Sequence, residues 1–191
     1  MPKLYIIAGC NGAGKTTASY TVLPEMLDCK EFVNADEIAR GLSPFNSGQV
    51  NFQAGRLMRQ RMEELMSEGA DFAFETTLST RSYVDFINRA RGYGYFVSLL
   101  FFWLPSPEQA VERVYMRVLS GGHDIPKDVI FRRYERGLHN LLNLYIPICD
   151  TWDIYNNSSA DADIKIIACG ECGKESKIFD IESYNKIKIY E

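Results

Sequence analysis

Residues Gly9 to Thr16 read Gly-Cys-Asn-Gly-Ala-Gly-Lys-Thr and match the pattern G-x-x-x-x-G-K-[ST] at every fixed position. The stretch follows the apolar run Leu4–Ala8, which predicts a strand, and it precedes a segment expected to be helical. Glycines at these positions let the backbone turn its N–H groups inward around a phosphate. The order of strand, glycine-rich loop and helix therefore predicts a nucleoside triphosphate site.

The residues of this loop have separate expected roles. Lys15 is expected to reach the outer phosphates as a point charge, and the Thr16 hydroxyl to take a coordination position on Mg²⁺. The helix that begins near Lys15 adds the partial positive charge of its N-terminus. Contacts with the nucleotide are expected along the whole loop, from Gly9, Asn11, Gly12, Ala13, Gly14, Lys15, Thr16 and Thr17.

Composition indicates a compact enzyme. The 191 residues are 46% hydrophobic, which suits one domain with a sizeable core. The longest apolar stretch, Tyr95–Leu104, is too short for a membrane span and too far into the chain for a signal peptide. We therefore expect one cytoplasmic domain over residues 1–191, with no membrane partner.

Five cysteines form an odd set in a chain without an export signal, so free thiols are expected rather than disulfides. Cys169 and Cys172 form a C-x-x-C pair, but a closed zinc site requires four ligands and the sequence has no second such pair. We interpret this pair as a plain turn.

The charge of the chain is unevenly spread. The net charge of −4 argues against a general nucleic-acid binder. The segment from Arg113 to Arg136, however, contains six Lys or Arg residues and only three acidic residues. A local basic cluster in an acidic protein indicates a discrete anionic ligand rather than a long polyanion.

Apolar segments alternate with segments of helical spacing along the chain. Strands are predicted at residues 4–8, 31–34, 71–75, 95–104, 152–155 and 163–168. Helices are predicted at residues 15–27, 50–69, 81–91, 106–121 and 126–146. This alternation predicts an α/β fold with a parallel sheet and helices on both faces. In the strand-rich tail, residues 152–191, the Ile187 and Ile189 alternation favours an added edge hairpin.

Carboxylates follow two of the predicted strands. Ligands of such sheets bind at the carboxyl ends of the strands, so Asp36 and Glu75 are expected to meet the glycine-rich loop in one crevice. No apolar run of four residues ends in Asp, and this layout favours phosphoryl transfer to a hydroxyl over a hydrolytic switch. Asp36 is expected to accept the hydroxyl proton, with an N-cap as a compatible second role. Glu75 either binds a substrate hydroxyl or holds Mg²⁺ through water, with a helix cap as the alternative.

Arginines recur at helical spacing on two successive helices, as Arg113 with Arg117 and then Arg132 with Arg136. The glycine-bearing segment between the helices can act as a hinge. We expect a lid at about residues 113–136 that presses an arginine onto the transferring phosphoryl group. A solvated helix face is the alternative for any single arginine, and His123 either joins the lid or caps the turn.

The chain resembles the zeta-toxin family of P-loop kinases in three loops, at residues 11–17, 33–36 with Arg40, and 74–78. It is similar to the compact, stand-alone branch of that family in three later segments, residues 121–126, 132–134 and 152–158. Together these segments extend the resemblance over nearly the whole chain.

The resemblance implies a nucleotide-kinase-like fold, ATP with Mg²⁺, and phosphorylation of the 3′-hydroxyl of the amino sugar in UDP-N-acetylglucosamine. By position, Asp36 matches the general base of the family and Lys15 its phosphate-binding lysine. Arg113 or Arg117 matches the first lid arginine. Larger members place a second lid arginine where this chain has His123, so the next helix is expected to supply that charge from Arg132, Arg133 or Arg136.

The resemblance also implies a substrate site and a partner. Substrate contacts are expected from Arg40, Glu75, Thr76, Thr77 and His123, with Glu75 as the substrate-site carboxylate. A small antitoxin protein is the implied partner, seated over the ATP crevice where it blocks Lys15 and Thr16.

Two other functions stay open from the residues alone. The first is a detoxifying or metabolic small-molecule phosphotransferase with the same catalytic layout. The second is a nucleotide-binding regulatory module in which ATP controls partner docking without turnover. The second predicts tight ATP binding with no product that depends on Asp36.

Overall fold

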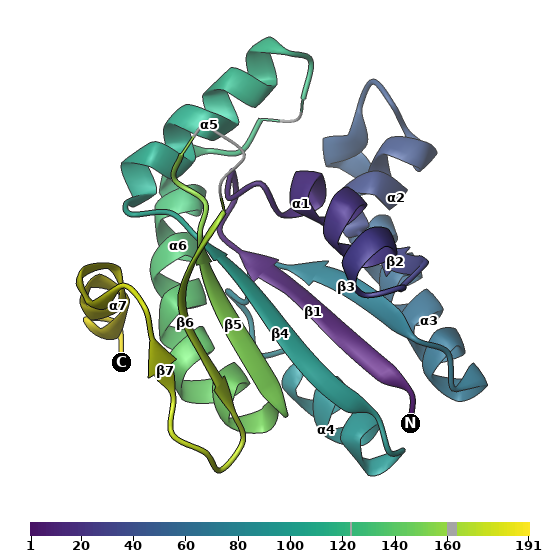
Figure 1. The fold of residues 1–191 in the computed structure, drawn as a ribbon. Coiled ribbons are helices and arrows are strands. Elements are labelled where there is room, and N and C mark those ends of the chain that lie inside the picture. The colour runs from purple at the N-terminus through teal and green to yellow at the C-terminus, as the bar shows by residue number, and fades with distance from the viewer. Residues whose placement is uncertain (123, 160–163) are drawn as a thin grey trace.

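The computed structural model describes residues 1–122, 124–159 and 164–191. A seven-stranded sheet runs through it in the order β2-β3-β1-β4-β5-β6-β7, with helices on both sides (Figure 1). The strands are β1 (Lys3–Gly9), β2 (Glu31–Val33), β3 (Phe72–Thr76), β4 (Phe96–Trp103), β5 (Thr151–Asn156), β6 (Lys165–Glu171) and β7 (Lys177–Ile178). The α-helices are α1 (Lys15–Thr21), α2 (Ala35–Leu42), α3 (Asn51–Glu68), α4 (Val84–Gly92), α5 (Pro107–Leu119), α6 (Lys127–Asn140) and α7 (Ile181–Lys188).

Short helical segments of other types extend or precede three of these helices. A π-helical turn, Val22–Met26, continues α1, and a 3-10 turn, Ser47–Val50, precedes α3. Helix α6 continues as a π-helical turn, Leu141–Tyr145, and a 3-10 turn, Ile146–Ile148. The predicted helices 15–27 and 126–146 therefore exist, but their last turns are wider or tighter than an α-helix.

The predicted parallel sheet is confirmed for the five strands β2, β3, β1, β4 and β5. β1 lies at its centre, and every β1 residue after Lys3 is buried, as expected of a strand covered on both faces. β6 and β7 instead pair antiparallel. The connection of residues 157–164 between β5 and β6 is too short for the crossover that a parallel pair requires.

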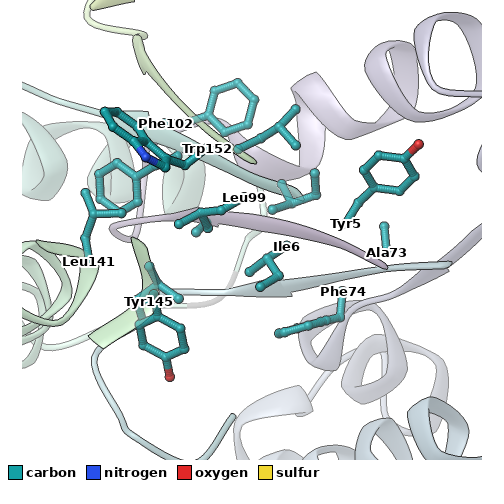
Figure 2. Close-up of a cluster of buried hydrophobic side chains, with 14 of the residues drawn as sticks. Tyr5, Ile6, Ala73, Phe74, Leu99, Phe102, Leu141, Tyr145 and Trp152 are labelled. Atoms are coloured by element: carbon teal, nitrogen blue, oxygen red, sulfur yellow. The ribbon is translucent and has the colours of Figure 1, made fainter. Parts of the chain in front are cut away.

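The core forms on both faces of the central strands. Figure 2 shows Tyr5 and Ile6, neighbours in β1, pointing to opposite sides of the sheet. Phe74 from β3 pairs in register with Ile6 and lies on its side of the sheet, and so does Trp152 from β5, which pairs with Leu99 of β4 beside Ile6. Phe102 from β4 lies on the other side, with Tyr5. β4 lies between β1 and β5, so the prediction of an interior strand at residues 95–104 is confirmed.

The tail differs from the prediction. Ile187 and Ile189 do not form an edge hairpin, because residues 181–188 fold as α7. Asp180 caps this helix, since its Oδ1 accepts a hydrogen bond from the Ser183 backbone N–H at 3.1 Å. Ile187 is fully buried against the core, whereas Ile189 is exposed beyond the helix end. An alternation of two residues is too short to distinguish a strand from a helix turn.

The structure also places the cysteines. All five are free thiols, with Cys10, Cys29 and Cys149 buried. Cys169 lies within β6 and Cys172 in the turn that follows this strand. In the described part of the chain, no three metal-ligating side chains gather at one point. None of the described helices is long and apolar enough to cross a membrane.

Candidate active site

The glycine-rich loop joins β1 to α1 at the carboxyl edge of the sheet, as the motif predicts. Gly14 immediately before α1 has a φ of +79°, a left-handed conformation that favours glycine. A Cβ at Gly14 would lie 2.5 Å from the Asn157 amide nitrogen. That amide donates a hydrogen bond to the Ala13 carbonyl at 2.7 Å. The chain that follows β5 therefore supports the loop from outside.

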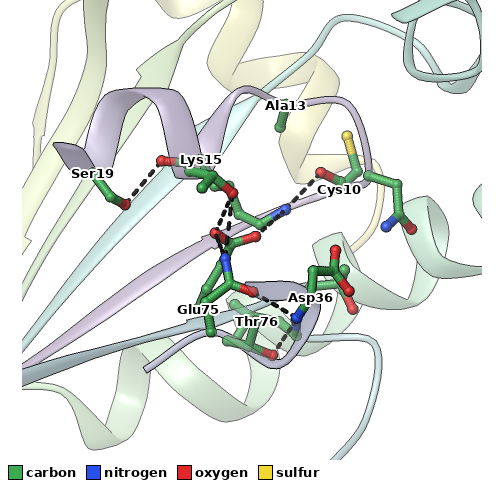
Figure 3. Close-up of polar contacts among 12 residues, drawn as sticks. Cys10, Ala13, Lys15, Ser19, Asp36, Glu75 and Thr76 are labelled. Carbon is green, nitrogen blue, oxygen red and sulfur yellow. Dashed lines mark hydrogen bonds and ion pairs between the residues drawn. The ribbon is translucent and has the colours of Figure 1, made fainter. Parts of the chain in front are cut away.

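Lys15 is held across this loop, as Figure 3 shows. Its ammonium donates a hydrogen bond to the Cys10 carbonyl at 3.0 Å and lies 3.5 Å from Glu75 Oε1. The side chain is only 6% exposed and that of Glu75 11% exposed. A buried charge requires a partner, and Glu75 is the ion-pair partner of Lys15 here.

Glu75 also connects the loop to β2. Its Oε2 accepts hydrogen bonds from the Thr16 hydroxyl at 2.7 Å and from the Asn34 amide at 2.8 Å. Hydroxyl, carboxylate and amide oxygens are the ligand types that Mg²⁺ takes beside phosphates. The residues present therefore fit a site for Mg²⁺ with a nucleotide, in which Thr16 and Glu75 would hold the metal.

Asn34 is a site residue that the sequence reasoning missed. Its Oδ1 accepts hydrogen bonds from the backbone N–H groups of Asp36 at 2.8 Å and Glu37 at 3.4 Å. Asn34 is therefore the N-cap of α2, and Asp36 lies in the first turn rather than at the cap. The suggested capping role of Asp36 is wrong. The sequence did contain a signal for this cap, because Asn is as good an N-cap as Asp and Asn34 stands two residues before Asp36.

Asp36 is exposed at the mouth of a hollow of about 330 Å³. The hollow is lined by charged groups and by a row of hydroxyls: Lys15, Asp36, Glu75, Arg133, Thr76, Thr77, Ser79, Thr80, Ser82 and Tyr83 are among its residues. Asp36 also lines a smaller hollow of about 60 Å³ with Arg40 and Arg117. The structure thus brings the loop, Asp36 and Glu75 into one crevice.

The other predicted substrate residues differ in their surroundings. Thr76 and Thr77 follow Glu75 along the wall of the larger hollow, where the Thr76 hydroxyl accepts a hydrogen bond from the Leu78 N–H. Arg40 pairs with Glu37 at 3.2 Å and is largely exposed. His123 lies outside the described residues. In the loop itself, Thr17 is exposed on the first turn of α1.

The two arginines of α5 have different surroundings. Arg113 packs beside Gly12, and its guanidinium donates hydrogen bonds to the carbonyls of Ser158 at 3.0 Å and Ser159 at 3.3 Å. Arg113 therefore ties α5 to the segment after β5. Arg117 is half-buried and lines the smaller hollow beside Asp36.

Of the three arginines of α6 that the sequence left open, the structure brings Arg133 to the loop, and not the helically spaced pair Arg132 and Arg136. Arg132 and Arg136 are exposed, and neither lines the two hollows beside Asp36. Arg133, between them, is half-buried and donates a hydrogen bond to Asn11 Oδ1 at 3.3 Å. Ile130 and Tyr134 bury one face of α6, which turns Arg132 and Arg136 toward solvent.

Burial shifts the pKa values of two side chains at the glycine-rich loop, Arg133 and Cys10. Burial lowers the pKa of the Arg133 guanidinium from its usual value, and the Asp36 carboxylate opposes this shift. Burial raises the pKa of the Cys10 thiol to about 11, and the Lys15 charge opposes this shift. Cys10 is therefore a protonated, buried thiol at neutral pH, and its backbone carbonyl is the group that contacts Lys15.

Comparison with known proteins agrees with this geometry. Residues 1–160 match the family described as zeta toxin. An uncharacterized protein of Haemophilus influenzae is 30% identical over 134 residues, which are 69% of this chain and 92% of that protein.

Two solved structures show the same fold. A chain of the AvrRxo1-ORF1:-ORF2 complex with ATP has a TM-score of 0.79 at 21% identity, and the match covers 98% of this chain. This chain spans only 63% of that one. A chain of the PezAT chromosomal toxin–antitoxin system of Streptococcus pneumoniae has a TM-score of 0.66 at 15% identity, covering 100% of this chain and 84% of that one.

The family match covers most of the chain and includes every loop that builds the crevice. The chain belongs to the zeta-toxin family of P-loop kinases, which are ATP-dependent phosphotransferases.

Proposed function

We propose that this kinase transfers the γ-phosphate of ATP to a hydroxyl of a small molecule, with Asp36 as the general base. The observation that carries the proposal is the hollow of about 330 Å³, which is lined by Asp36, by Asn11 and Lys15 of the glycine-rich loop, and by several hydroxyl side chains. Lys15 and Asp36 line the same hollow, so a nucleotide phosphate on one side and an acceptor hydroxyl on the other fit within it.

In this mechanism the acceptor oxygen forms a bond to the γ-phosphorus as the bond from that phosphorus to the β,γ-bridging oxygen breaks. Asp36 accepts the proton of the acceptor hydroxyl, and ADP leaves with its terminal phosphate oxygen. Lys15 holds the outer phosphates of the nucleotide. Mg²⁺, when bound, neutralises the charge of the phosphates. Thr16 and Glu75 are the side chains that would hold it.

For the acceptor we propose UDP-N-acetylglucosamine, phosphorylated on the 3′-hydroxyl of its amino sugar. The family supports this choice, and the row of hydroxyls at Thr76, Thr77, Ser79, Thr80 and Ser82 offers hydrogen-bond partners for a polyhydroxylated ring. We also propose that residues 1–191 act as one kinase domain.

The test is a kinase assay with ATP and Mg²⁺ against nucleotide sugars, dinucleotides and free sugars, with products identified by mass spectrometry. We expect one phosphate, an added mass of about 80 Da, on UDP-N-acetylglucosamine. Phosphate on a free sugar or another metabolite instead would favour the detoxifying or metabolic phosphotransferase. ATP binding without any phosphorylated acceptor would favour the regulatory module.

A small antitoxin protein is the partner that we propose. Its support lies in the two similar structures, which come from a complex of two open reading frames and from a toxin–antitoxin system. Expression of the kinase alone should then arrest growth of a bacterial host, and the Lys15→Ala variant should not. Normal growth of cells that make the active kinase would contradict this partner.

A further inference from the structure

One cation in the crevice has no role in the proposed mechanism. Arg133 lines the same hollow as Lys15 and Asp36, and its guanidinium reaches Asn11 of the glycine-rich loop across 122 positions of sequence. In the described residues, Lys15 and Arg133 are the two cationic side chains that line this hollow. A half-buried guanidinium beside a phosphate loop is suited to bind an anion, because its planar fork matches phosphate oxygens.

The helix that carries Arg133 is fixed in the core at three points. Tyr134, which is 3% exposed, donates a hydrogen bond from its hydroxyl to the Leu104 carbonyl at 2.7 Å. The Asn140 amide donates to the Leu78 carbonyl at 2.7 Å. Gly137 packs so closely on the Thr77 carbonyl that a Cβ there would lie 2.7 Å from its oxygen.

These contacts join α6 to the segment that directly follows Glu75. Thr77 and Leu78 belong to the loop after β3, and Leu104 follows β4, so α6 is anchored to both neighbours of the phosphate loop. A helix held in this way does not swing like a lid. Arg133 is therefore placed at the crevice before any nucleotide arrives, and little conformational entropy is lost when it binds a phosphate.

We propose that Arg133 is a catalytic residue that contacts the γ-phosphate of ATP from this fixed helix, in place of an arginine delivered by a moving lid. The inference rests on the proposed kinase function and names the residue that completes its phosphate site. Asn11 orients the guanidinium through its side-chain oxygen, and Lys15, which lines the same hollow, is the second cation for the phosphates. Arg132 and Arg136 take no part.

The test compares the affinities for two nucleotides that differ only in the third phosphate. Adenylyl imidodiphosphate, which is not cleaved, and ADP are titrated calorimetrically into the unchanged protein and into Arg133→Ala. We expect the unchanged protein to prefer the triphosphate analogue, and Arg133→Ala to lose about tenfold or more of that preference while its ADP affinity stays the same. A purely structural role for Arg133 would instead weaken both nucleotides together, which would overturn the proposal.

Matched variants on the same helix sharpen the result. Lys127→Ala removes one positive charge from an exposed position of α6 and should keep the preference. Loss of the preference in Arg132→Ala or Arg136→Ala, with Arg133→Ala unchanged, would overturn the proposal. If Arg133→Ala does not fold, Arg133→Lys keeps the charge without the planar fork and should lose part of the preference, and a full preference there would also overturn it.

The nucleotide measurement is independent of the acceptor. If no acceptor is phosphorylated but the preference still depends on Arg133, the phosphate contact stands and the proposed transfer reaction fails. If the unchanged protein binds both nucleotides equally, the contact itself is refuted, whatever the kinase assay shows.

Discussion

Replacement of Glu75 by Gln tests how the ion pair between Glu75 and Lys15 stabilises the glycine-rich loop. The change keeps the size and a hydrogen-bonding oxygen for Thr16 and Asn34, but it removes the negative charge 3.5 Å from the Lys15 ammonium. Both side chains are almost fully buried. Removal of one partner of a buried ion pair costs about 3–5 kcal/mol, and the lower end applies because Lys15 keeps its bond to the Cys10 carbonyl.

A loss of about 3 kcal/mol lowers Tm by roughly 6–12 °C in a protein of this size. The control is Glu63→Gln, which breaks the ion pair with Arg89 on the surface, where both partners are more than 40% exposed and the pair contributes less than about 1 kcal/mol. The phosphates of ATP then neutralise the unpaired Lys15. ATP without Mg²⁺ should therefore raise Tm more in Glu75→Gln than in the unchanged protein. Thermal unfolding in EDTA measures both effects, and equal losses in the two variants would refute the reasoning.

Three further changes probe the surroundings of the site. Gly14→Ala forces a side chain into a left-handed backbone conformation and against the Asn157 amide. The control is Gly69→Ala, where φ is also positive but the space is open, and it should lose only about 1–2 kcal/mol of unfolding free energy. Denaturant unfolding should show a larger loss for Gly14→Ala than for this control. Asn34→Ala removes the cap of α2 and should cost about 1–2 kcal/mol of unfolding free energy, with a normal stability contradicting the capping role. Iodoacetamide at pH 7.5 should label the exposed Cys172 well before the buried Cys10. Burial raises the pKa of the Cys10 thiol to about 11, so this thiol stays protonated until the pH approaches that value. Mass spectrometry of the peptides shows the order of labelling.

Much of the fold could be predicted because its signals are local. The glycine-rich loop after an apolar run defines β1 and α1, and Ser106 with Pro107 marks the start of α5, where the Ser106 hydroxyl accepts a hydrogen bond from the Gln109 N–H. The α7 helix escaped prediction because its cap, Asp180, was overlooked in favour of a two-residue alternation. Local capping chemistry outweighed a weak periodic pattern there.

The sequence predicted those parts of the site that lie directly at the carboxyl ends of the strands. Lys15, Asp36 and Glu75 meet because parallel strands end at one edge of the sheet. Which of three neighbouring arginines faces the loop depends on the phase of α6 about its own axis, and charge spacing alone does not give that phase. The buried spacing of Ile130, Tyr134 and Leu138 does give it, and those apolar residues are the signal that points to Arg133.

The most direct test of the proposed function is a single-turnover kinase assay on UDP-N-acetylglucosamine with the Asp36→Asn variant. Its matched control is Glu37→Gln, which removes a charge one position later on α2. We predict that Asp36→Asn binds ATP normally and transfers phosphate about 10² to 10⁴ times more slowly, whereas Glu37→Gln keeps the rate. A full transfer rate in Asp36→Asn would contradict the assignment of the general base and with it the proposed mechanism.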